Sequence, residues 1–164
     1  MNLEEWFTIG MKREVNPLIR IGGRISIDLG AGNNPVAGAK PLDWPDWIAP
    51  APLPFESETV GTVWAHHFLE HLSGEDAIKV LREIQRVLIP RGVANIVVPY
   101  YNSQMQATDP DHKSAWCEET WKNLFANDMY QKNHDGWRME VNACWIIGIV
   151  ERNLALFTQL RKKP

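Results

Sequence analysis

A strand, a helix and a second strand follow one another in the middle of the chain. Residues 59–65 are rich in β-branched side chains, and residues 93–98 are mostly apolar and stop at Pro99. Both patterns are typical of buried strands. Between them, apolar residues recur at helical spacing. A helix between two neighbouring strands carries the chain back across a sheet, so the strands pair in parallel. The pattern predicts an α/β fold.

The predicted helix has recognisable ends. Ser73 is suited to be its N-cap, and Asp76 three residues later is suited to complete a capping box. Pro90 and Gly92 are predicted to end it, because proline cannot continue a helix and glycine commonly follows one.

The remaining apolar segments extend the sheet. Pro41 is expected to place its strand at an edge, and the last two runs are expected to form an antiparallel hairpin. We therefore predict a single compact domain over residues 1–164. The other predicted elements are strands at 24–30, 39–43, 141–150 and 154–160 and a helix at 118–126.

Composition excludes several classes of partner. The 164 residues include 17 Lys plus Arg and 20 Asp plus Glu, so the net charge of -3 predicts no nucleic-acid partner. No apolar run is long enough to span a membrane and no leader pattern is present, so we expect a cytoplasmic protein without a membrane partner. Eight tryptophans are unusual, and those in or near predicted loops either line a pocket or fill the core: Trp44, Trp47, Trp116 and Trp137.

Residues suited to ligand binding stand where three predicted strands end. The first strand runs into Asp28-Leu29-Gly30-Ala31-Gly32, the second ends at Asp43, and the third at Ala65 and His66. Ligands of open α/β sheets bind beyond these carboxyl ends, and a carboxylate there can accept hydrogen bonds from ribose hydroxyls. The dinucleotide pattern fails, because Pro35 replaces its third glycine and no helix follows. A nucleoside without phosphates fits better.

These residues, together with several later blocks, resemble the class I S-adenosylmethionine (SAM)-dependent methyltransferases, in particular the small type 11-like family. The resemblance covers roughly residues 24–127. Any one block is weak evidence, but all of them occur in the family's order. The blocks are Ile25 to Gly32, Pro52 to Phe55, Val60 to Trp64, His67 to Leu72, Leu81 to Ile84, Arg86 to Gly92, Val97 to Pro99 and Asp109 to Lys113.

The resemblance implies a Rossmann-like methyltransferase domain, with a mixed, mostly parallel sheet and a C-terminal antiparallel hairpin. Only residues 44–58 separate Asp43 from Thr59, so the fold is expected to be shortened between the family's second and fourth strands. The implied SAM contacts are Asp28, Gly30, Ala31 and Gly32 to the methionine part, Asp43 to the ribose, Leu53 to the adenine, and Ala65 and His66 near the amino acid and sulfonium.

The implied activity is methyl transfer from SAM to an unidentified acceptor, expected to be a small molecule. A hydroxyl or amine acceptor requires a base, and His66 and His112 are the first candidates. Tyr100 and Tyr101 are expected to shape the acceptor pocket. No separate acceptor-binding domain fits in this length, so a second subunit of a homodimer is one means of enclosing the acceptor.

Three alternatives stay open. The chain can be a non-catalytic SAM-binding module on the same fold, or an enzyme that cleaves SAM. His67-Phe68-Leu69-Glu70-His71 also satisfies the H-x-x-E-H pattern of zinc hydrolases, in which a helix places both histidines on one face. No third ligand is evident, so we expect no metal.

Overall fold

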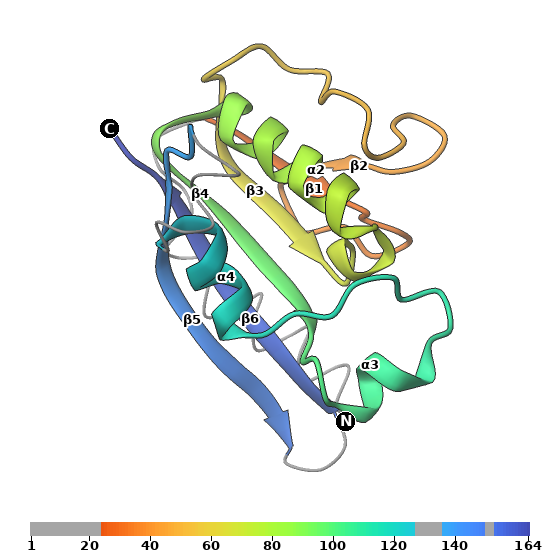
Figure 1. The fold of residues 1–164 in the computed structure, drawn as a ribbon. Coiled ribbons are helices and arrows are strands. Elements are labelled where there is room, and N and C mark those ends of the chain that lie inside the picture. The colour runs from red at the N-terminus through yellow and green to blue at the C-terminus, as the bar shows by residue number, and fades with distance from the viewer. Residues whose placement is uncertain (1–23, 127–135, 150–152) are drawn as a thin grey trace.

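A mixed sheet forms the centre of the computed structural model, which describes residues 24–126, 136–149 and 153–164 (Figure 1). In this part of the chain the sheet has six strands in the order β2-β1-β3-β4-β6-β5. The first four pair in parallel, whereas β6 is antiparallel to both β4 and β5. The strands are β1 (Ile25–Leu29), β2 (Lys40–Leu42), β3 (Val60–His66), β4 (Leu88–Pro99), β5 (Met139–Ile149) and β6 (Asn153–Lys162).

This topology confirms the predicted α/β class and the mixed sheet. β2 is an edge strand, as Pro41 indicated, and Pro41 lies opposite Asp28 of β1. The C-terminal hairpin is also confirmed, although only one of its two strands, β5, lies at an edge of the sheet. β6 lies between β5 and β4 and pairs with β4 from Pro99 back to Val93.

The helix α2 (Gly74–Val87) begins as its capping pattern predicts. Ser73 is the N-cap, and its hydroxyl oxygen accepts the Asp76 backbone N–H at 3.1 Å. The apolar face of the helix packs in the main core, and the buried residues on it are Ala77, Val80, Leu81, Ile84 and Val87.

The predicted end of α2 was wrong. The helix stops at Val87, and β4 begins directly at Leu88 rather than after Gly92. Leu88 takes an extended conformation and pairs with Val60 before the register shifts. The Pro90-Arg91-Gly92 segment therefore forms an irregularity within the strand. Proline is tolerated in a strand at such a position, where the ladder is already interrupted.

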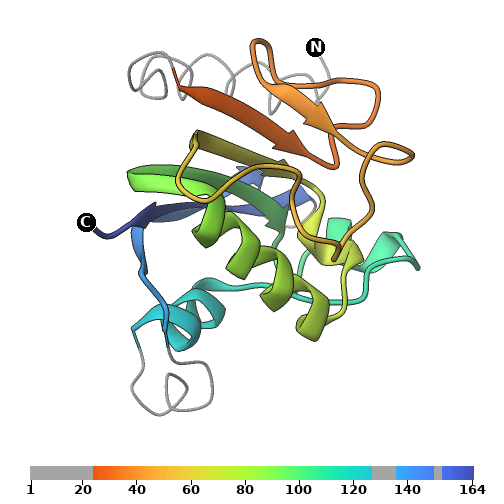
Figure 2. The ribbon, with the colours of Figure 1, turned by 90° about the horizontal axis from the view of Figure 1, so that it is seen from above.

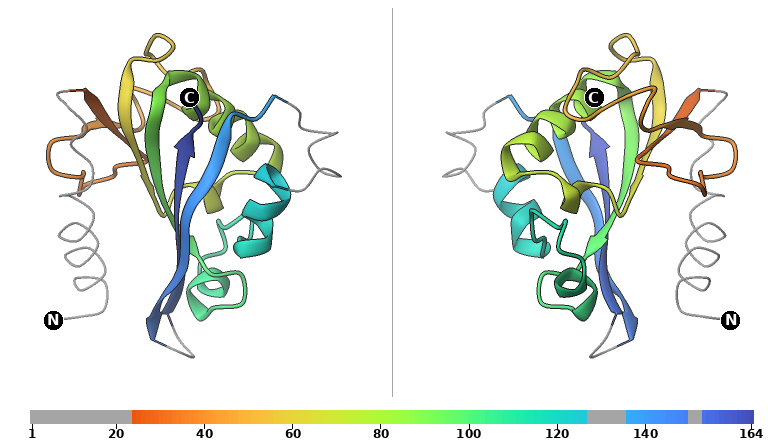
Figure 3. Two further views of the ribbon diagram at one scale, coloured as in Figure 1. Left: turned by 90° about the vertical axis from the view of Figure 1, so that its left-hand side faces the viewer. Right: turned by 90° about the vertical axis from the view of Figure 1, so that its right-hand side faces the viewer.

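The described helices α2 and α4 cover the same face of the sheet (Figures 2 and 3). The helix α4 (Glu118–Phe125) agrees with the predicted one and buries Trp121, Leu124 and Phe125. The short helix α3 (Gln104–Thr108) was not predicted. Its Met105 packs against a smaller apolar cluster, which combines strand residues with Val36 from the loop after β1.

The segment between β2 and β3 contains no helix and no strand, which agrees with the expected shortening. It is anchored instead by single contacts with α2, such as the hydrogen bond from the Leu53 N–H to Glu83. Among the described residues, no helix has the length and apolar character required to cross a membrane.

Candidate functional site

The carboxyl ends of β1, β2 and β3 form one rim of the sheet. The chain leaves β1 toward β2 on one side, whereas β3 and then β4 lie on the other side of β1. The strand order therefore reverses at β1, and ligands of open α/β sheets bind beside such a reversal. We call the last residues of β1, β2 and β3, together with the residues that follow them at this edge, the carboxyl rim.

Asp28 holds the loop that follows β1. Its side chain is 3% exposed, and one carboxylate oxygen accepts the Val36 backbone N–H at 2.7 Å. The Asn34 N–H donates to the Ala31 carbonyl at 3.3 Å and closes a turn within the same loop. Asp28 and Ala31 thus shape the loop from inside. Their predicted contacts with methionine stay predictions.

Gly30 lies beneath the ring of Phe68. A Cβ atom at Gly30 would lie 2.5 Å from Phe68 Cδ2, and the backbone has φ +64°, a conformation that side chains disfavour. Phe68 also packs against Trp47, with ring centroids 5.9 Å apart. The space that a Cβ atom of residue 30 would need is therefore already occupied by the ring of Phe68.

Gly32 and Asp43 meet at the exposed side of the rim. The Gly32 N–H donates to Asp43 Oδ2 at 2.8 Å, and the Trp44 N–H donates to Oδ1 at 2.7 Å. A Cβ atom at Gly32 would have no heavy atom within 4 Å. Because a carboxylate offers about four lone-pair sites, these two bonds leave acceptor capacity for a ligand. The structure thus joins two predicted site residues beside open space.

Trp44 is one of the four tryptophans for which the sequence left a pocket and a core position open. Its side chain is 75% exposed, whereas Trp47 and Trp116 are buried in the core. Trp44 directly follows Asp43, and its backbone N–H bonds the Asp43 carboxylate. A large exposed ring next to a carboxylate can serve as a ligand-binding surface, but no local pattern distinguishes Trp44 from the core tryptophans.

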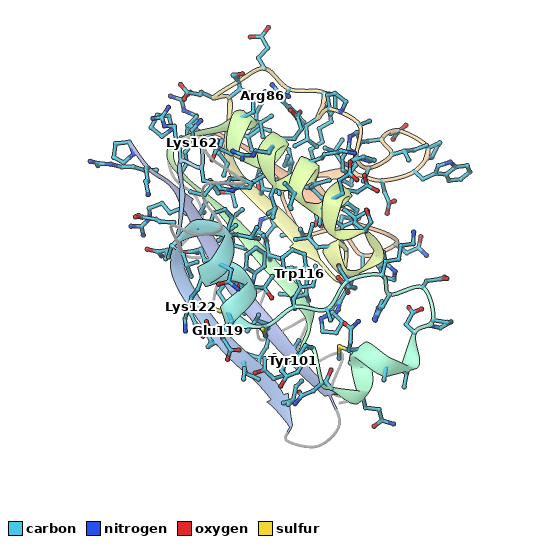
Figure 4. The ribbon with its side chains drawn as sticks, viewed as in Figure 1. Arg86, Tyr101, Trp116, Glu119, Lys122 and Lys162 are labelled. Carbon is cyan, nitrogen blue, oxygen red and sulfur yellow. The ribbon has the colours of Figure 1, made fainter. Side chains whose placement is uncertain are left out.

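Leu53, the predicted adenine neighbour, lies in the core and is 3% exposed. Its N–H donates to Glu83 Oε2 at 2.8 Å, and its carbonyl accepts from Arg86 at 3.0 Å. Arg86 also donates to Glu83, which lowers the pKa of that carboxyl, and to the Phe55 carbonyl. Arg86 lies near the end of α2 at the end of the sheet where Lys162 is found (Figure 4). The backbone of Leu53 is therefore engaged in holding the loop.

Comparisons with known proteins agree with this geometry. A family model described as a methyltransferase domain matches residues 47–96. No curated protein matches the sequence. The match begins beside Asp43 and runs through Phe68, α2 and most of β4. The matched segment therefore includes the end of β3 at the rim and the helix α2 that connects β3 to β4.

The solved structures that resemble this chain share its fold. A methyltransferase from Haloferax volcanii, solved in complex with the Trm112 methyltransferase activator, has a TM-score of 0.60 at 14% identity, covering 98% of this chain and 97% of that one. A SAM-dependent methyltransferase from Archaeoglobus fulgidus has a TM-score of 0.61 at 13% identity, covering 97% of both chains.

A third similar structure has a ligand of the expected class. It is the 1,6-didemethyltoxoflavin-N1-methyltransferase of Burkholderia thailandensis with bound S-adenosylhomocysteine, at a TM-score of 0.61 and 14% identity, covering 97% of this chain and 81% of that one. Residues 47–96 match the methyltransferase-domain family. The fold is that of the SAM-dependent methyltransferases, and the cofactor that this likeness implies is SAM.

In this methyltransferase-like fold, Ala65 and His66 complete the carboxyl rim at the end of β3. Ala65 is fully buried and pairs with Leu29 of β1. His66 is half-buried, and its ring packs edge-on against Trp64 with centroids 5.3 Å apart. Both residues thus lie beside the glycine turn, and their proposed approach to the sulfonium stays a prediction.

The second candidate base, His112, lies in the loop between α3 and α4. Its side chain is 7% exposed. Its Nδ1 is 3.1 Å from the Gln106 carbonyl, and its ring packs edge-on against His71 with centroids 4.9 Å apart. The sequence did not indicate this contact between the two histidines, because 40 residues separate them and no local pattern relates them.

The tyrosines that follow β4 have other partners. The Tyr100 hydroxyl donates to Glu118 of α4 at 3.1 Å, and its ring packs edge-on against Tyr101 with centroids 5.0 Å apart. Burial, followed by the hydrogen bond to Glu118, raises the pKa of Tyr100. Its phenol is therefore protonated near neutral pH. Tyr101 is exposed and remains available to shape a pocket.

Proposed function

We propose that this methyltransferase binds SAM across Gly32 and Asp43 and transfers its methyl group to a small-molecule acceptor. The observation that carries the proposal is the hydrogen bond between the Gly32 N–H and Asp43 beside open space. The ribose hydroxyls of SAM would donate to the remaining lone pairs of Asp43. The lack of a side chain at Gly32 lets the ligand approach the backbone closely.

Trp44 takes the adenine contact in this proposal. Its exposed ring follows Asp43, so a ribose held by Asp43 brings the attached base within reach of it. Stacking of a base on an aromatic side chain contributes about 1–3 kcal/mol. Leu53 would then support the loop from the core rather than form the wall of the adenine pocket.

The chemistry of the bound cofactor is an activated methyl group on a sulfonium. The chain's own contribution is to hold the acceptor atom opposite the sulfur, an effect of proximity worth several kcal/mol. For a hydroxyl or amine acceptor, His66 would remove the proton during transfer, because it is the last residue of β3 and is half-buried beside the glycine turn.

Titration calorimetry with SAM and S-adenosylhomocysteine tests the cofactor site. Asp43→Ala is expected to weaken SAM binding by about 1–3 kcal/mol, because hydrogen bonds to a charged acceptor are lost. Trp44→Ala is expected to weaken both ligands by about 1–3 kcal/mol through lost stacking. Asp46→Ala, which removes an exposed carboxylate from the same loop, is the matched control. Unchanged affinity in folded Asp43→Ala would contradict the ribose assignment.

A SAM-binding module without turnover is the second candidate. The packing of Phe68 on Gly30 favours it, because this ring fills space at the turn and narrows the room for the methionine part. A panel of small-molecule acceptors, assayed for release of S-adenosylhomocysteine, separates the two functions. Binding of SAM without release across the panel would favour the module, and methylthioadenosine as product would indicate cleavage. Light scattering of the same samples tests the predicted homodimer.

A further inference from the structure

A second group of chemically active side chains lies beside the rim, on the short 3-10 helix η2 (Leu69–His71) that follows β3. The loop that contains His112 is tied to this helix. The backbone N–H groups of Lys113 and Ser114 both donate to the Glu70 carbonyl, at 2.7 and 3.1 Å. The Ser114 hydroxyl donates to the Leu69 carbonyl at 3.1 Å. These bonds hold His112 against η2.

Three potential ligand atoms converge there. One carboxylate oxygen of Glu70 and one ring nitrogen each of His71 and His112 lie within 4.8 Å of one another. Glu70 is fully buried, and the His112 side chain is 7% exposed. One carboxylate and two imidazoles are a ligand set that zinc and non-haem iron sites use.

One oxygen of the buried Glu70 carboxylate lacks a hydrogen-bond partner among the described residues. Its Oε1 is 3.3 Å from His67 Nδ1, whereas its Oε2 is buried and has no hydrogen-bond partner among the described residues. A buried polar atom without a partner costs roughly 1–3 kcal/mol, and more when the group is charged. A cation bound between Glu70 and the two histidines would give this buried carboxylate a compensating charge.

His112 is oriented as a metal ligand would be. A carbonyl oxygen only accepts hydrogen bonds, so the contact with the Gln106 carbonyl places the proton on His112 Nδ1. Nε2 then keeps its lone pair. Asp109 Oδ2 is 3.6 Å from Nε2, which is beyond hydrogen-bond distance. Metal-bound histidines commonly donate their other ring N–H to a backbone carbonyl in this way.

We infer that Glu70, His71 and His112 form a binding site for a divalent transition-metal ion such as Zn²⁺. Three protein ligands leave at least one coordination position for water or for an oxygen atom of a ligand. In this site His112 binds the metal through Nε2 and does not act as a base. The site is independent of the proposed SAM contacts, because it uses none of the residues on the exposed side of the rim.

This ligand set differs from the linear H-x-x-E-H motif. An α-helix would place His67 and His71 on one face, but the segment forms a 3-10 helix that begins at Leu69. His67 precedes it, has a φ of 51° and is 43% exposed. The α-helical geometry that the motif requires is therefore not formed by residues 67–71. His112, which is distant in sequence, takes the place of His67 in the cluster.

Calorimetric titration of the chelator-treated protein with Zn²⁺ tests the inference. We expect binding of one ion per chain. Glu70→Gln and His112→Gln are each expected to weaken binding by more than about tenfold, since loss of even an outer partner of a ligand costs 10–100-fold. Glu75→Gln, which removes an exposed carboxylate of α2 outside the cluster, is the control and is expected to stay within about threefold of wild type. Circular dichroism confirms that each variant is folded.

Two results would overturn the metal site. One is the absence of saturable Zn²⁺ binding by the wild-type protein. The other is a loss of binding in His67→Gln with full binding in His112→Gln, which would point to the linear motif. As a second measurement, Zn²⁺ should raise the Tm of the wild type but not of His112→Gln. Titration of SAM into the metal-free protein measures cofactor binding separately. A protein that binds SAM but not Zn²⁺ would contradict the metal site alone, and one that binds Zn²⁺ but not SAM would contradict the cofactor site alone.

Discussion

Alanine substitution at the two glycines of the rim separates the role of protein packing from that of an open surface. Gly30 and Gly32 have similar backbone conformations, with φ of 64° and 51°. Their surroundings differ, because Phe68 covers Gly30 and no heavy atom lies within 4 Å of a Cβ at Gly32. Gly30→Ala and Gly32→Ala therefore place the same methyl group in two environments.

The expected magnitudes follow from these contacts. Holding an alanine in the left-handed region costs about 1–2 kcal/mol, partly offset by about 0.4–1 kcal/mol from the less flexible unfolded chain. Gly32→Ala should therefore lower the free energy of unfolding by about 1 kcal/mol. At Gly30 the new Cβ would also lie 2.5, 2.9 and 3.0 Å from the Cδ2, Cγ and Cβ of Phe68. Since Phe68 Cβ cannot rotate away, overpacking adds about 1–3 kcal/mol.

Urea unfolding followed by circular dichroism measures this difference, and SAM titration gives the second reading. Gly30→Ala should lose about 2–4 kcal/mol of stability. Gly32→Ala should keep most of its stability but lose SAM affinity, because its methyl group enters the space proposed for the cofactor. In a Phe68→Ala background, Gly30→Ala should be no more destabilising than Gly32→Ala is in the wild type.

Equal destabilisation by the two substitutions in the wild-type background would refute the argument. So would a Gly30→Ala effect that persists unchanged when Phe68 is replaced. Either result would mean that Phe68 does not pack on the turn. Full SAM affinity in Gly32→Ala would separately contradict the proposed position of the cofactor.

Two further substitutions test the anchoring of the segment between β2 and β3 and the packing of α4. Arg86→Leu should lower the free energy of unfolding by about 2 kcal/mol, because Arg86 bonds Glu83 and the Leu53 carbonyl; Arg86→Lys keeps the charge without the forked geometry and should recover only part of this loss. Arg86 lowers the pKa of Glu83 from its ordinary value of 4.5, so the stabilisation by this ion pair is present above pH 4.5 and is lost as the pH falls through the lower folded-state pKa. If Arg86→Leu stayed equally destabilised relative to the wild type throughout an acid titration, that result would contradict the ion pair. Trp121→Ala should cost about 3–5 kcal/mol in urea unfolding, because Trp121 is fully buried. Trp121→Phe should cost less than half as much, since Trp121 Nε1 has no partner among the described residues and its removal sacrifices no hydrogen bond; equal losses would show that this N–H is satisfied.

Features that depend on nearby residues were predictable. The start of α2 follows from Ser73 and Asp76, and its buried face follows from the spacing of apolar residues. The end of α2 was not, because pairing of Leu88 with Val60 competes with the helix and begins β4 before Pro90. Tertiary pairing overrides local propensity where both conformations are accessible.

In the candidate site, too, local patterns predicted some features and tertiary packing decided others. Glycines and Asp43 at strand ends were visible as a pattern, because parallel strands bring their carboxyl ends to one edge. The pattern could not say that Phe68 covers Gly30 while Gly32 faces open space. That distinction depends on how the segment after β3 turns back over the rim, and no local signal encodes it.

The amino-acid sequence alone determined the α/β class, the parallel central strands and the family resemblance, since periodicity and short motifs act over a few residues. Only the tertiary structure decided which motif residues are internal supports and which are exposed. It also brought His112 to Glu70 and His71, replacing the linear motif with a different set of three. The physical reason is that ligand geometry depends on contacts between distant segments, which close packing fixes only when the whole sheet has formed.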